Sequence, residues 1–479
     1  MEITQNKLLI ANRGEIAVRI IRAAKELGIR TVAVYSTADA DSLHVQLADE
    51  AICVGTEKSK DSYLNINNIL SAAISTGCNA IHPGYGFLAE NDKFIEQVEE
   101  IGLKFVGPRA EVVRKLGDKA EARKIAKSSN VPIVEGSDGV VTDVNEGIKI
   151  ANKIGYPVMI KAVSGGGGRG ISVVYSNKEF LAVFEKTSQE AEISFGNKAV
   201  YIEKFIAKPR HIEVQILADN HGNYIHLYER DCSIQRRNQK MIEEAPSSEI
   251  NDLVRRRIGL ASLRIAKKVG YTNAGTVEFI LDKDDKFYFI EMNTRIQVEH
   301  PVTEMITGID LVKEQIRIAY DNKLNIKQRD VKIMGHAIEC RINAEDPLNN
   351  FRPSPGEIKR ILVPGGMGVR FDSFIYPNYH IPPYYDSMLG KLIVVAPTRR
   401  EAIRKMRVAL EQLFIEGVQT NIEYQYMIIH HPEFIKGKYD TSFIAKFHAL
   451  VMEENNAEVI EWEKKANFWI SKNRSKKRI

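Results

Sequence analysis

The sequence predicts a mixed fold, α/β at its start and α+β overall, and two observations lead to this prediction. Strand-like and helix-like segments alternate through roughly the first hundred residues, as in a parallel sheet with crossover helices. Later, a β-branched and apolar segment at residues 276–281 and an aromatic-rich one at 286–293 flank a polar loop at 282–285, as in an antiparallel hairpin. With 479 residues, 44% of them hydrophobic, the chain can form about two to four packed units.

The alternation at the start of the chain predicts a parallel sheet. Ile16, Ile20, Ala24 and Leu27 recur on one face of a helix that follows the first strand. A second helix is expected from about residue 63 to residue 75. The expected strands are residues 7–12, 31–36, 50–55 and 79–82. Strands and helices in this order are typical of β-α-β units.

A glycine-rich stretch follows apolar residues that lead into Lys161. Residues 165–168 are all glycine, and glycine lets backbone N–H groups approach phosphate oxygens closely. Lys161 can add a positive charge to such a loop. A phosphate-binding hairpin loop is therefore one interpretation, and a flexible linker is the other. Neither G-x-x-x-x-G-K-[ST] nor G-x-G-x-x-G is present, which disfavours a P-loop or a dinucleotide fold.

The hairpin at residues 276–293 predicts a metal site. If residues 282–285 form its loop, Leu281 faces Lys286 and Glu278 faces Phe289. Glu278, Glu291 and Asn293 then share one face of the hairpin, with diagonal neighbours roughly 7–8 Å apart. Oxygen ligands at such spacing suit one or two magnesium ions. Solvent-facing carboxylates are the alternative, but the aromatic residues around them indicate a largely buried strand pair.

Composition excludes several classes of protein. The net charge of +5 comes largely from the terminal segment 471–479, which is expected to be a solvated tail and not a nucleic-acid contact. The four cysteines, which lack C-x-x-C spacing, predict neither a zinc site nor a disulfide framework. Without a signal-peptide pattern or an apolar run near the ~20 residues that span a bilayer, the chain is expected to be cytoplasmic.

Taken together, these motifs resemble those of ATP-grasp enzymes and, more narrowly, of biotin carboxylases. The resemblance rests on the glycine run, the Glu278…Glu291-x-Asn293 hairpin and the Arg295-x-Gln-x-Glu299 segment that follows it. Further matching stretches are residues 82–91, 229–240, 351–358 and 385–392. The resemblance extends from about residue 5 to about residue 445.

The resemblance implies a division of the chain into domains. Residues 1–116 would form a Rossmann-like pre-ATP-grasp domain and 117–330 the ATP-grasp domain, with a mobile lid at about 131–206. Residues 331–447 would form the C-terminal biotin carboxylase domain, packed over the ATP-grasp body, and 448–479 a tail.

The resemblance also implies the reaction: ATP- and bicarbonate-dependent carboxylation of biotin through carboxyphosphate. Mg²⁺ or Mn²⁺ would be held by Glu278, Glu291 and Asn293, the first two also contacting ATP. The other ATP-binding residues would be Lys119, Lys161, Gly165, Gly166, Gly167, Gly168, Glu203, Lys204, Phe205, Ile206, His211, Gln235 and Asn238. Transfer of a phosphoryl group needs this concentration of positive charge and oriented donors.

Bicarbonate and biotin would bind beside the nucleotide. Lys240, Arg295, Gln297 and the Val298 amide would hold bicarbonate, and Glu299 would accept its proton as the general base. Arg341 would stabilise the enolate form of biotin. The alternative for Lys240 and Arg341 is a surface or ion-pair role, and the alternative for His211 is a structural role. Residues 85–86 and Asp386, although they lie in matching stretches, are expected to be structural or close to the biotin pocket.

Asn238 departs from the family pattern, which usually has histidine there. Because asparagine cannot carry charge, a modest change in nucleotide affinity or pH response is expected. Ile171-Ser172 is a second departure, where the family commonly has methionine and a basic residue.

The resemblance further implies partners. No Met-Lys-Met carrier motif is present, so biotin is expected on a separate carrier protein, with a carboxyltransferase completing the cycle. Arg22, Glu26 and Arg370 match dimer-interface positions of the family, although solvated charges are the alternative. The final acceptor, acetyl-CoA, propionyl-CoA or pyruvate, stays open. Another ATP-grasp ligase and a nucleotide-binding regulator remain as alternative functions.

Overall fold

The computed structural model describes residues 6–163 and 170–452. The predicted phosphate-loop glycines, Gly165 to Gly168, and the part of the tail from residue 453 lie outside the described residues.

The chain begins with a five-stranded sheet in the order β3-β2-β1-β4-β5, in which all neighbouring strands are parallel. The parallel sheet expected from the alternation is therefore confirmed. Its strands are β1 (Lys7–Ile10), β2 (Arg30–Ser36), β3 (Glu50–Gly55), β4 (Ala80–His82) and β5 (Lys104–Phe105). Its helices are α1 (Gly14–Glu26), α2 (Leu43–Leu47), α3 (Ile66–Ser75), α4 (Asp92–Glu100) and α5 (Ala110–Gly117).

Helix α3 begins later than the sequence predicts. The Asn65 side chain accepts a hydrogen bond from the amide of Asn68 and so caps the helix. Tyr63, the expected start, is fully buried and donates its hydroxyl to Asp39, 2.6 Å away. Tertiary packing, which the helical periodicity does not report, therefore removes this residue from the helix.

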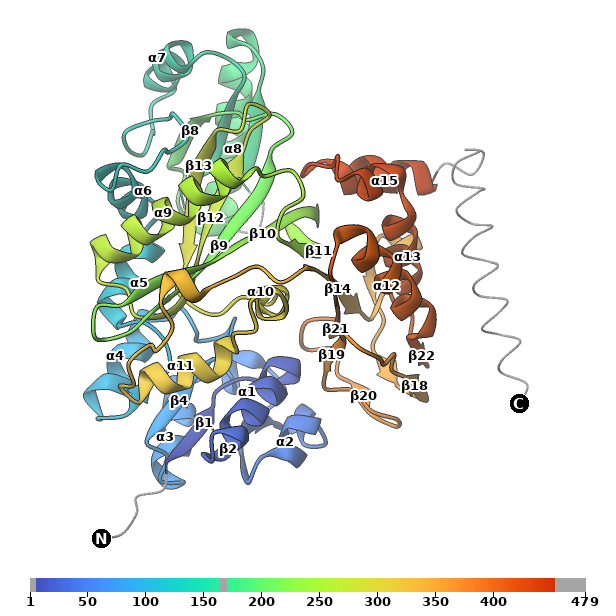
Figure 1. Ribbon diagram of the computed structural model, residues 1–479. Helices are drawn as coiled ribbons and strands as arrows, with labels where there is room; N and C mark the ends of the chain where they lie inside the picture. Colours follow the sequence, from blue (N-terminus) through green and yellow to red (C-terminus); the bar gives the residue numbers. More distant parts are fainter. Residues whose placement is uncertain (1–5, 164–169, 453–479) are drawn as a thin grey trace.

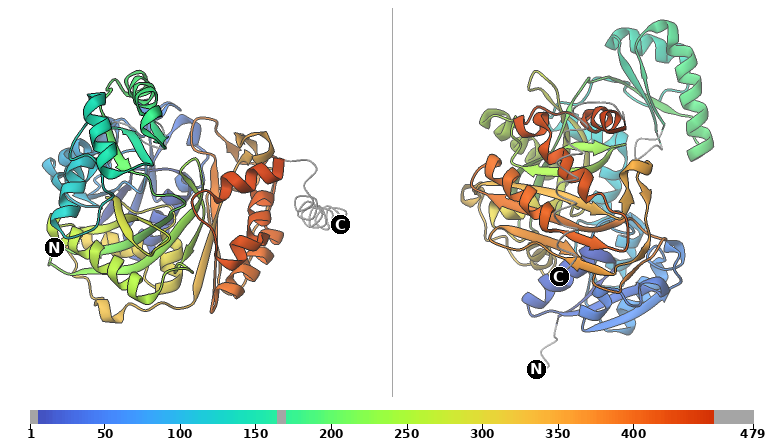
Figure 2. Two further views of the ribbon diagram at one scale, coloured as in Figure 1. Left: turned by 90° about the horizontal axis from the view of Figure 1, so that it is seen from above. Right: turned by 90° about the vertical axis from the view of Figure 1, so that its right-hand side faces the viewer.

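A small three-stranded antiparallel unit projects from the rest of the molecule, at the top of Figure 1 and of the right-hand view in Figure 2. Helix α6 (Lys119–Ser128) leads into it. The unit contains α7 (Val144–Ile154), β6 (Val158–Ala162), β7 (Ile171–Val174), α8 (Asn177–Phe195) and β8 (Val200–Lys204), with the strands in the order β7-β6-β8. Strands β6 and β7 are the two arms of the hairpin predicted around the glycine run.

The largest sheet has eight strands in the order β13-β12-β9-β10-β11-β14-β21-β19. Its strands are β9 (Arg210–Ala218), β10 (Tyr224–Arg236), β11 (Gln239–Ala245), β12 (Asn273–Leu281), β13 (Phe287–Asn293), β14 (His336–Asn343), β19 (Val369–Ser373) and β21 (Met388–Ala396). Helices α9 (Asp252–Val269), α10 (His300–Thr307) and α11 (Leu311–Ala319) lie between its segments in the chain.

The C-terminal part continues this sheet edge to edge, because β11 pairs with β14. It was expected only to pack over the ATP-grasp body, so this continuity is new. The remaining α-helices are α12 (Arg399–Gln412), α13 (Ile422–His430), α14 (Pro432–Lys436) and α15 (Phe443–Met452), of which α12, α13 and α15 contact the sheet. Short strands complete the part: β15 (Glu345–Asp346), β16 (Arg352–Pro353), β17 (Gly356–Glu357), β18 (Arg360–Leu362), β20 (His380–Ile381) and β22 (Phe414–Glu416).

The β12–β13 hairpin forms, but its predicted register is wrong. Leu281 pairs with Phe287, not with Lys286, and a bulge at Ile290 shifts the pairing toward the end of β13. Glu278 consequently lies directly opposite Glu291, not opposite Phe289. Directly opposed residues are closer than diagonal ones, so the bulge brings the two carboxylates nearer than the sequence indicated.

Candidate active site

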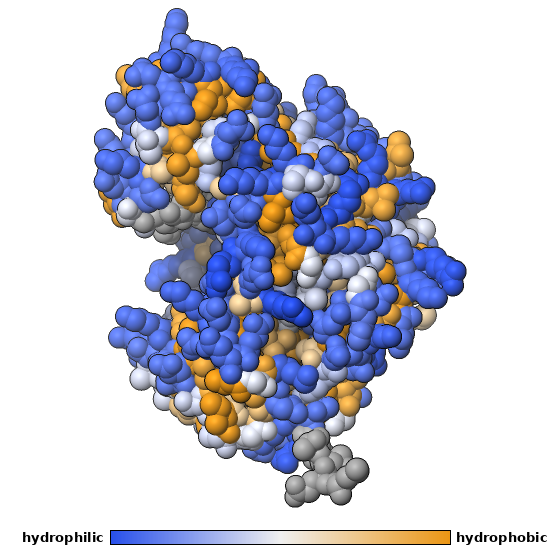
Figure 3. Space-filling view, turned by 90° about the vertical axis from the view of Figure 1, so that its left-hand side faces the viewer, coloured by the Kyte–Doolittle hydropathy of each residue, from blue (hydrophilic) through white to orange (hydrophobic). Residues whose placement is uncertain are grey.

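One cleft of about 1290 Å³ collects side chains from all parts of the chain. Figure 3 shows a hollow between the three-stranded unit above and the rest of the molecule below. The predicted site residues that line the cleft are Lys119, Lys161, Glu203, Lys204, Phe205, Ile206, His211, Gln235, Asn238, Lys240, Glu278, Glu291, Asn293, Arg295, Gln297, Val298 and Arg341. Glu299 is fully buried and contacts two of them. The structure thus brings every described member of the predicted set to one place.

The row of charged residues across the sheet begins with strand pairing. Glu213 of β9 pairs with Arg230 of β10 on one side and with Glu278 of β12 on the other, and Glu278 pairs with Glu291 of β13. Paired residues lie on the same face of a sheet, so one cation and three carboxylates form a line across four strands. Burial of carboxylates in a row is costly unless cations compensate them.

Lys240 supplies much of that compensation. Its Nζ lies 2.6 Å from Glu213 Oε2, 3.0 Å from Glu278 Oε1 and 2.6 Å from Glu299 Oε1. Burial acts to lower the pKa of Lys240, but these three carboxylates raise it well above its ordinary value. The three carboxylates therefore favour the charged form of Lys240 at the base of the cleft.

Glu299 is held between two cations. Its Oε1 accepts from Lys240, and its Oε2 accepts from Arg341 Nη2 at 2.9 Å. Burial acts to raise the pKa of Glu299, but Lys240 and Arg341 hold it well below the ordinary value. Arg341 also donates from Nε to Glu243 Oε1 at 2.7 Å, which fixes the guanidinium plane. Glu299 is consequently a carboxylate, the state that a proton acceptor needs.

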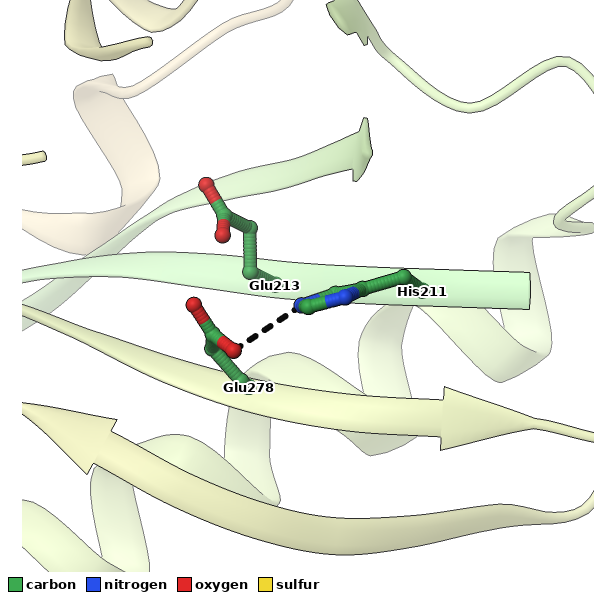
Figure 4. A group of neighbouring side chains, drawn as sticks. All are labelled: His211, Glu213 and Glu278. Atoms are coloured by element: carbon green, nitrogen blue, oxygen red, sulfur yellow. Dashed lines mark ion pairs between the residues drawn. The ribbon is translucent and has the colours of Figure 1, made fainter. Parts of the chain in front are cut away.

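His211 and Glu278 form a second charged pair, drawn in Figure 4. Nε2 of His211 lies 2.9 Å from Oε2 of Glu278, and Glu213 projects from the same strand as His211. Burial lowers the pKa of His211, but Glu278 raises it above 6.5 overall. One ligand atom from each of these three residues lies within 4.8 Å of the others.

The predicted metal ligands fit a hard cation by their chemistry. Burial and the carboxylate of Glu278 raise the pKa of Glu291, and a cation bound to both carboxylates would oppose this shift. Asn293 donates from Nδ2 to Glu278 Oε1 at 2.9 Å, so its amide lies against the same carboxylate. Two carboxylates and an amide oxygen are ligands that magnesium prefers.

Glu90 positions Arg295, and the sequence analysis did not identify it. Its Oε2 accepts from Arg295 Nε at 2.8 Å, and its Oε1 accepts from the amide of Thr294 at 3.0 Å. Arg295 also donates to Asn293 Oδ1, which links the predicted bicarbonate arginine to a predicted metal ligand. Glu90 lies in the matching stretch 82–91, which was the available signal.

Glu213 was missed as well, although a signal for it existed. His211, Glu213 and Gln215 alternate with Ile212, Val214 and Ile216 along β9. All these residues except His211 are buried, so the polar face of this strand points into the protein. Alternation with a buried polar face is typical of a strand that lines a site.

On the side of the cleft formed by β6 and β8, Glu203 balances two cations. Lys161 Nζ lies 2.5 Å from Glu203 Oε2, and Arg123 Nη1 lies 2.5 Å from Oε1. Burial acts to raise the pKa of Glu203, but Lys161 and Arg123 lower it overall. Lys204 donates to the carbonyl of Gly155 at 2.8 Å, so its ammonium points toward the loop before β6.

The turn that carries Asn238 explains part of its identity. Arg237 and Asn238 form the two-residue connection between β10 and β11, where Arg236 pairs with Gln239. Their φ angles are 49° and 64°, in the left-handed region, which asparagine tolerates better than most residues.

The residues that match dimer positions have different surroundings. Arg22 is exposed, and Glu26 forms an ion pair with Lys313. Arg370 pairs within its own chain, with Glu304 at 2.7 Å and with Asp372 at 2.6 Å.

The other residues of the matching stretches have structural contacts. Tyr85 lines the cleft and donates its hydroxyl to Glu15. Asp386 also lines the cleft, and its Oδ1 accepts from the amide of Met388 at 2.8 Å.

Within residues 6–163 and 170–452, no helix is both long and apolar enough to cross a bilayer.

Comparison with known proteins matches three family descriptions along the chain. Residues 4–113 match the biotin carboxylase N-terminal domain, 118–327 the ATP-binding domain of the carbamoyl-phosphate synthase L chain, and 339–446 the biotin carboxylase C-terminal domain. These matches are consecutive and together cover most of the sequence.

Individual relatives agree with these matches. Biotin carboxylase 1 of Bacillus subtilis is 58% identical over 93% of this chain and 99% of its own length. A pyruvate carboxylase component of Methanothermobacter thermautotrophicus is 52% identical over 92% of this chain and 90% of its own. The dimeric biotin carboxylase domain of Hydrogenobacter thermophilus 2-oxoglutarate carboxylase, solved with MgADP, ADP and bicarbonate, is 50% identical. It covers 94% of this chain and 98% of its own, with a TM-score of 0.88. The chain belongs to the biotin carboxylase family.

Proposed function

We propose that the cleft carboxylates biotin, using bicarbonate as the carbon source and ATP as the energy source. This is the first half-reaction of an acetyl-CoA carboxylase built from several separate chains. The observation that carries this proposal is the arrangement of Glu299 between Lys240 and Arg341. A buried carboxylate with a cation on each oxygen can accept the proton of bicarbonate. The two cations then remain to bind the more negatively charged anion that results.

The bicarbonate step uses the base of the cleft. Arg295, Gln297 and the Val298 amide hold the anion, with Lys240 beside it. Glu299 takes the proton of bicarbonate, whose freed oxygen attacks the γ-phosphorus of ATP while the bond to the β–γ bridging oxygen breaks. ADP leaves, and carboxyphosphate is the product.

The nucleotide lies over the row of carboxylates. The phosphates are held by Lys119, Lys161, His211 and the amides of residues 165–168. On binding, Lys161 gives up its ion pair with Glu203 and pairs with a phosphate oxygen instead. Glu278, Glu291 and Asn293 would hold magnesium or manganese, which would neutralise charge on the transferred phosphoryl group. Adenine is held by residues 203–206, with Gln235 and Asn238 nearby.

Biotin accepts the carboxyl group at Arg341. Carboxyphosphate breaks into carbon dioxide and phosphate, and phosphate removes the ureido proton. The guanidinium of Arg341 stabilises the resulting enolate, which attacks carbon dioxide through nitrogen. Because Arg341 also holds Glu299 in the structure, the two steps share one cation.

Several assignments complete the proposal. Biotin arrives on a separate carrier protein, a carboxyltransferase takes the carboxyl group onward in the cytoplasm, and the chain forms a homodimer like its 2-oxoglutarate carboxylase relative. The domains are residues 1–116, 117–330 and 331–447. The pyruvate carboxylase relative supports pyruvate as the alternative final acceptor.

The test is ADP release by the purified chain with magnesium and ATP. We expect release that needs both bicarbonate and free biotin, and a fall of about 10²-fold or more in Glu299→Gln because the proton acceptor is lost. Glu314→Gln is the matched control, since Glu314 is also buried but lies outside the cleft.

Two outcomes would contradict the proposal. Release that is indifferent to bicarbonate and biotin indicates another ATP-grasp ligase, which assays with other acids would identify. No ATP turnover under any condition, with the carrier protein present, indicates a binding role.

A further inference from the structure

Lys391 is a fully buried lysine to which the proposed mechanism gives no role. It lies in the middle of β21, and its side chain has no exposed surface. Its strand neighbours on either side are Arg341 of β14 and Asp372 of β19. A buried ammonium costs several kcal/mol unless partners compensate it, so its contacts are informative.

The contacts of Lys391 connect three distant parts of the chain. Nζ donates to the carbonyl of Val298 at 2.7 Å and lies 3.1 Å from Oε1 of Glu15. Glu15 belongs to the first turn of α1, and Tyr85 donates its hydroxyl to the same Oε1. A continuous polar chain therefore runs from Tyr85, through Glu15 and Lys391, to the loop that carries Glu299.

The carbonyl that Lys391 holds belongs to the peptide between Val298 and Glu299. Holding it fixes the ψ angle of Val298 and the starting point of the Glu299 side chain. The preceding carbonyl, that of Gln297, accepts from the Nδ1 of His300 at 2.8 Å. Two consecutive peptides are thus anchored, one by the first residue of α10 and one by a residue of β21.

We propose that Lys391 is a positioning residue, which orients the Val298–Glu299 peptide so that the Val298 amide and the Glu299 carboxylate meet the same bicarbonate. Glu15, whose Oε1 lies 3.1 Å from Nζ, keeps the Lys391 side chain in place. The inference deepens the proposed function and rests on it.

A role in the bicarbonate step predicts a selective kinetic defect. In Lys391→Met, we expect kcat/KM for bicarbonate to fall about 10- to 100-fold, because small displacements of a reacting group have effects of this size. KM for ATP should change less than about twofold, since Lys391 does not line the cleft. ADP release at varied bicarbonate, with saturating ATP and free biotin, measures both.

A second variant separates positioning from charge balance. Lys391→Met alone leaves Glu15 without its cation, which can destabilise the fold. The double variant Glu15→Gln and Lys391→Met removes both charges, so its thermal stability should recover. If Lys391 positions the peptide, the bicarbonate defect persists in the double variant. Recovery of kcat/KM for bicarbonate to within about twofold of wild type would show that the lysine only balances charge, and would overturn the inference.

Lys7 provides a matched control. Its Nζ also donates to a carbonyl, that of Thr76 at 2.6 Å, and pairs with a glutamate, Glu50 at 2.7 Å. None of these three residues lines the cleft, so Lys7→Met should keep the wild-type KM for bicarbonate. Equal defects in the two lysine variants would overturn the inference. Wild-type enzyme that ignores bicarbonate would instead reject the proposed function, and the inference with it.

Discussion

A single ammonium group, that of Lys240, holds three carboxylates together at the base of the cleft. Removing one partner of such a buried cluster leaves uncompensated charge and costs several kcal/mol. Changes at Lys240 would therefore mix lost chemistry with lost stability. Asn238, which is exposed at the mouth of the cleft, can be changed without this complication.

Asn238→His should make the affinity for ATP depend on pH. Imidazole has an ordinary pKa near 6.5, so it gains positive charge as the pH falls from 8 to 6 and attracts phosphates, whereas asparagine does not titrate. The quantity to compare is KM for ATP at pH 8 divided by KM for ATP at pH 6. We expect this ratio to be about two- to fivefold larger in the variant than in wild type, because an exposed ion pair contributes an energy of that size. Steady-state kinetics at the two pH values measure this ratio.

The control for this prediction is Asn238→Gly. Glycine keeps the left-handed turn, whose φ is 64°, and carries no titrating group, so it should behave like wild type. An unchanged ratio in the histidine variant would contradict the prediction.

At the scale of residues, the sequence indicated which side chains lie close together in the site, but not which charges compensate one another. Motif positions led to Lys240, Glu278 and Glu299, which do lie together. Glu213 and Glu90 escaped because their roles depend on contacts between strands and loops far apart in the chain. The alternation along β9 and the matching stretch 82–91 pointed to these residues, but neither pattern reports which partners they contact.

At the scale of elements, the hairpin of β12 and β13 shows what a periodic pattern leaves undetermined. Alternation correctly placed Glu278 and Glu291 on one face, since each residue of a strand points opposite to the next. The bulge at Ile290 depends on how β13 packs against its surroundings, so loop length alone gave the wrong register. The start of α3 was misplaced for a similar reason.

The burial of His44 in helix α2 predicts that the stability of the fold depends on pH. Nε2 of His44 lies 3.2 Å from the carbonyl oxygen of Val34. Burial lowers the pKa of His44 from 6.5 to about 4. The folded protein therefore keeps His44 neutral at pH values where the unfolded chain binds a proton. Its contribution is fully present above pH 6.5 and is lost as the pH falls toward 4.

We expect His44→Gln to remove this dependence. Between pH 7 and pH 5, wild type should lose roughly 2 kcal/mol of unfolding free energy relative to the variant. Urea unfolding followed by circular dichroism at both pH values gives the difference. A difference between the two proteins that does not change with pH would contradict the assignment.

At the scale of the whole molecule, the eight-stranded sheet joins the regions on either side of residue 330. The pairing of β11 with β14 lets Arg341, from the C-terminal part, reach Glu299 in the middle of the chain. The sequence indicated that several units build the site, but strand order across units is set by long-range pairing. Local periodicity carries no information about it.

The homodimer proposed above, with α1 in its interface, predicts that Arg22→Glu weakens self-association. Arg22 is exposed on α1, and reversing an interfacial charge replaces attraction with repulsion. We expect the dimer dissociation constant to rise by about tenfold or more, as measured by sedimentation velocity. Arg30→Glu, a reversal at another exposed arginine, should have no such effect. Equal effects of both reversals would argue against α1 as the interface.

The three-stranded unit has a hydrophobic core of its own. Every buried apolar residue of that cluster lies between Val141 and Ile202, whereas the cluster around Leu8 and Leu217 is shared by the first sheet and the eight-stranded sheet. A segment with a separate hydrophobic core can unfold locally while its neighbours stay folded. Segments that share a hydrophobic core unfold together. Amide protons of the unit should therefore exchange with solvent through a separate, less costly opening, while those of both sheets should exchange together. The unit that forms one wall of the cleft is thus the part whose unfolding is independent of the rest.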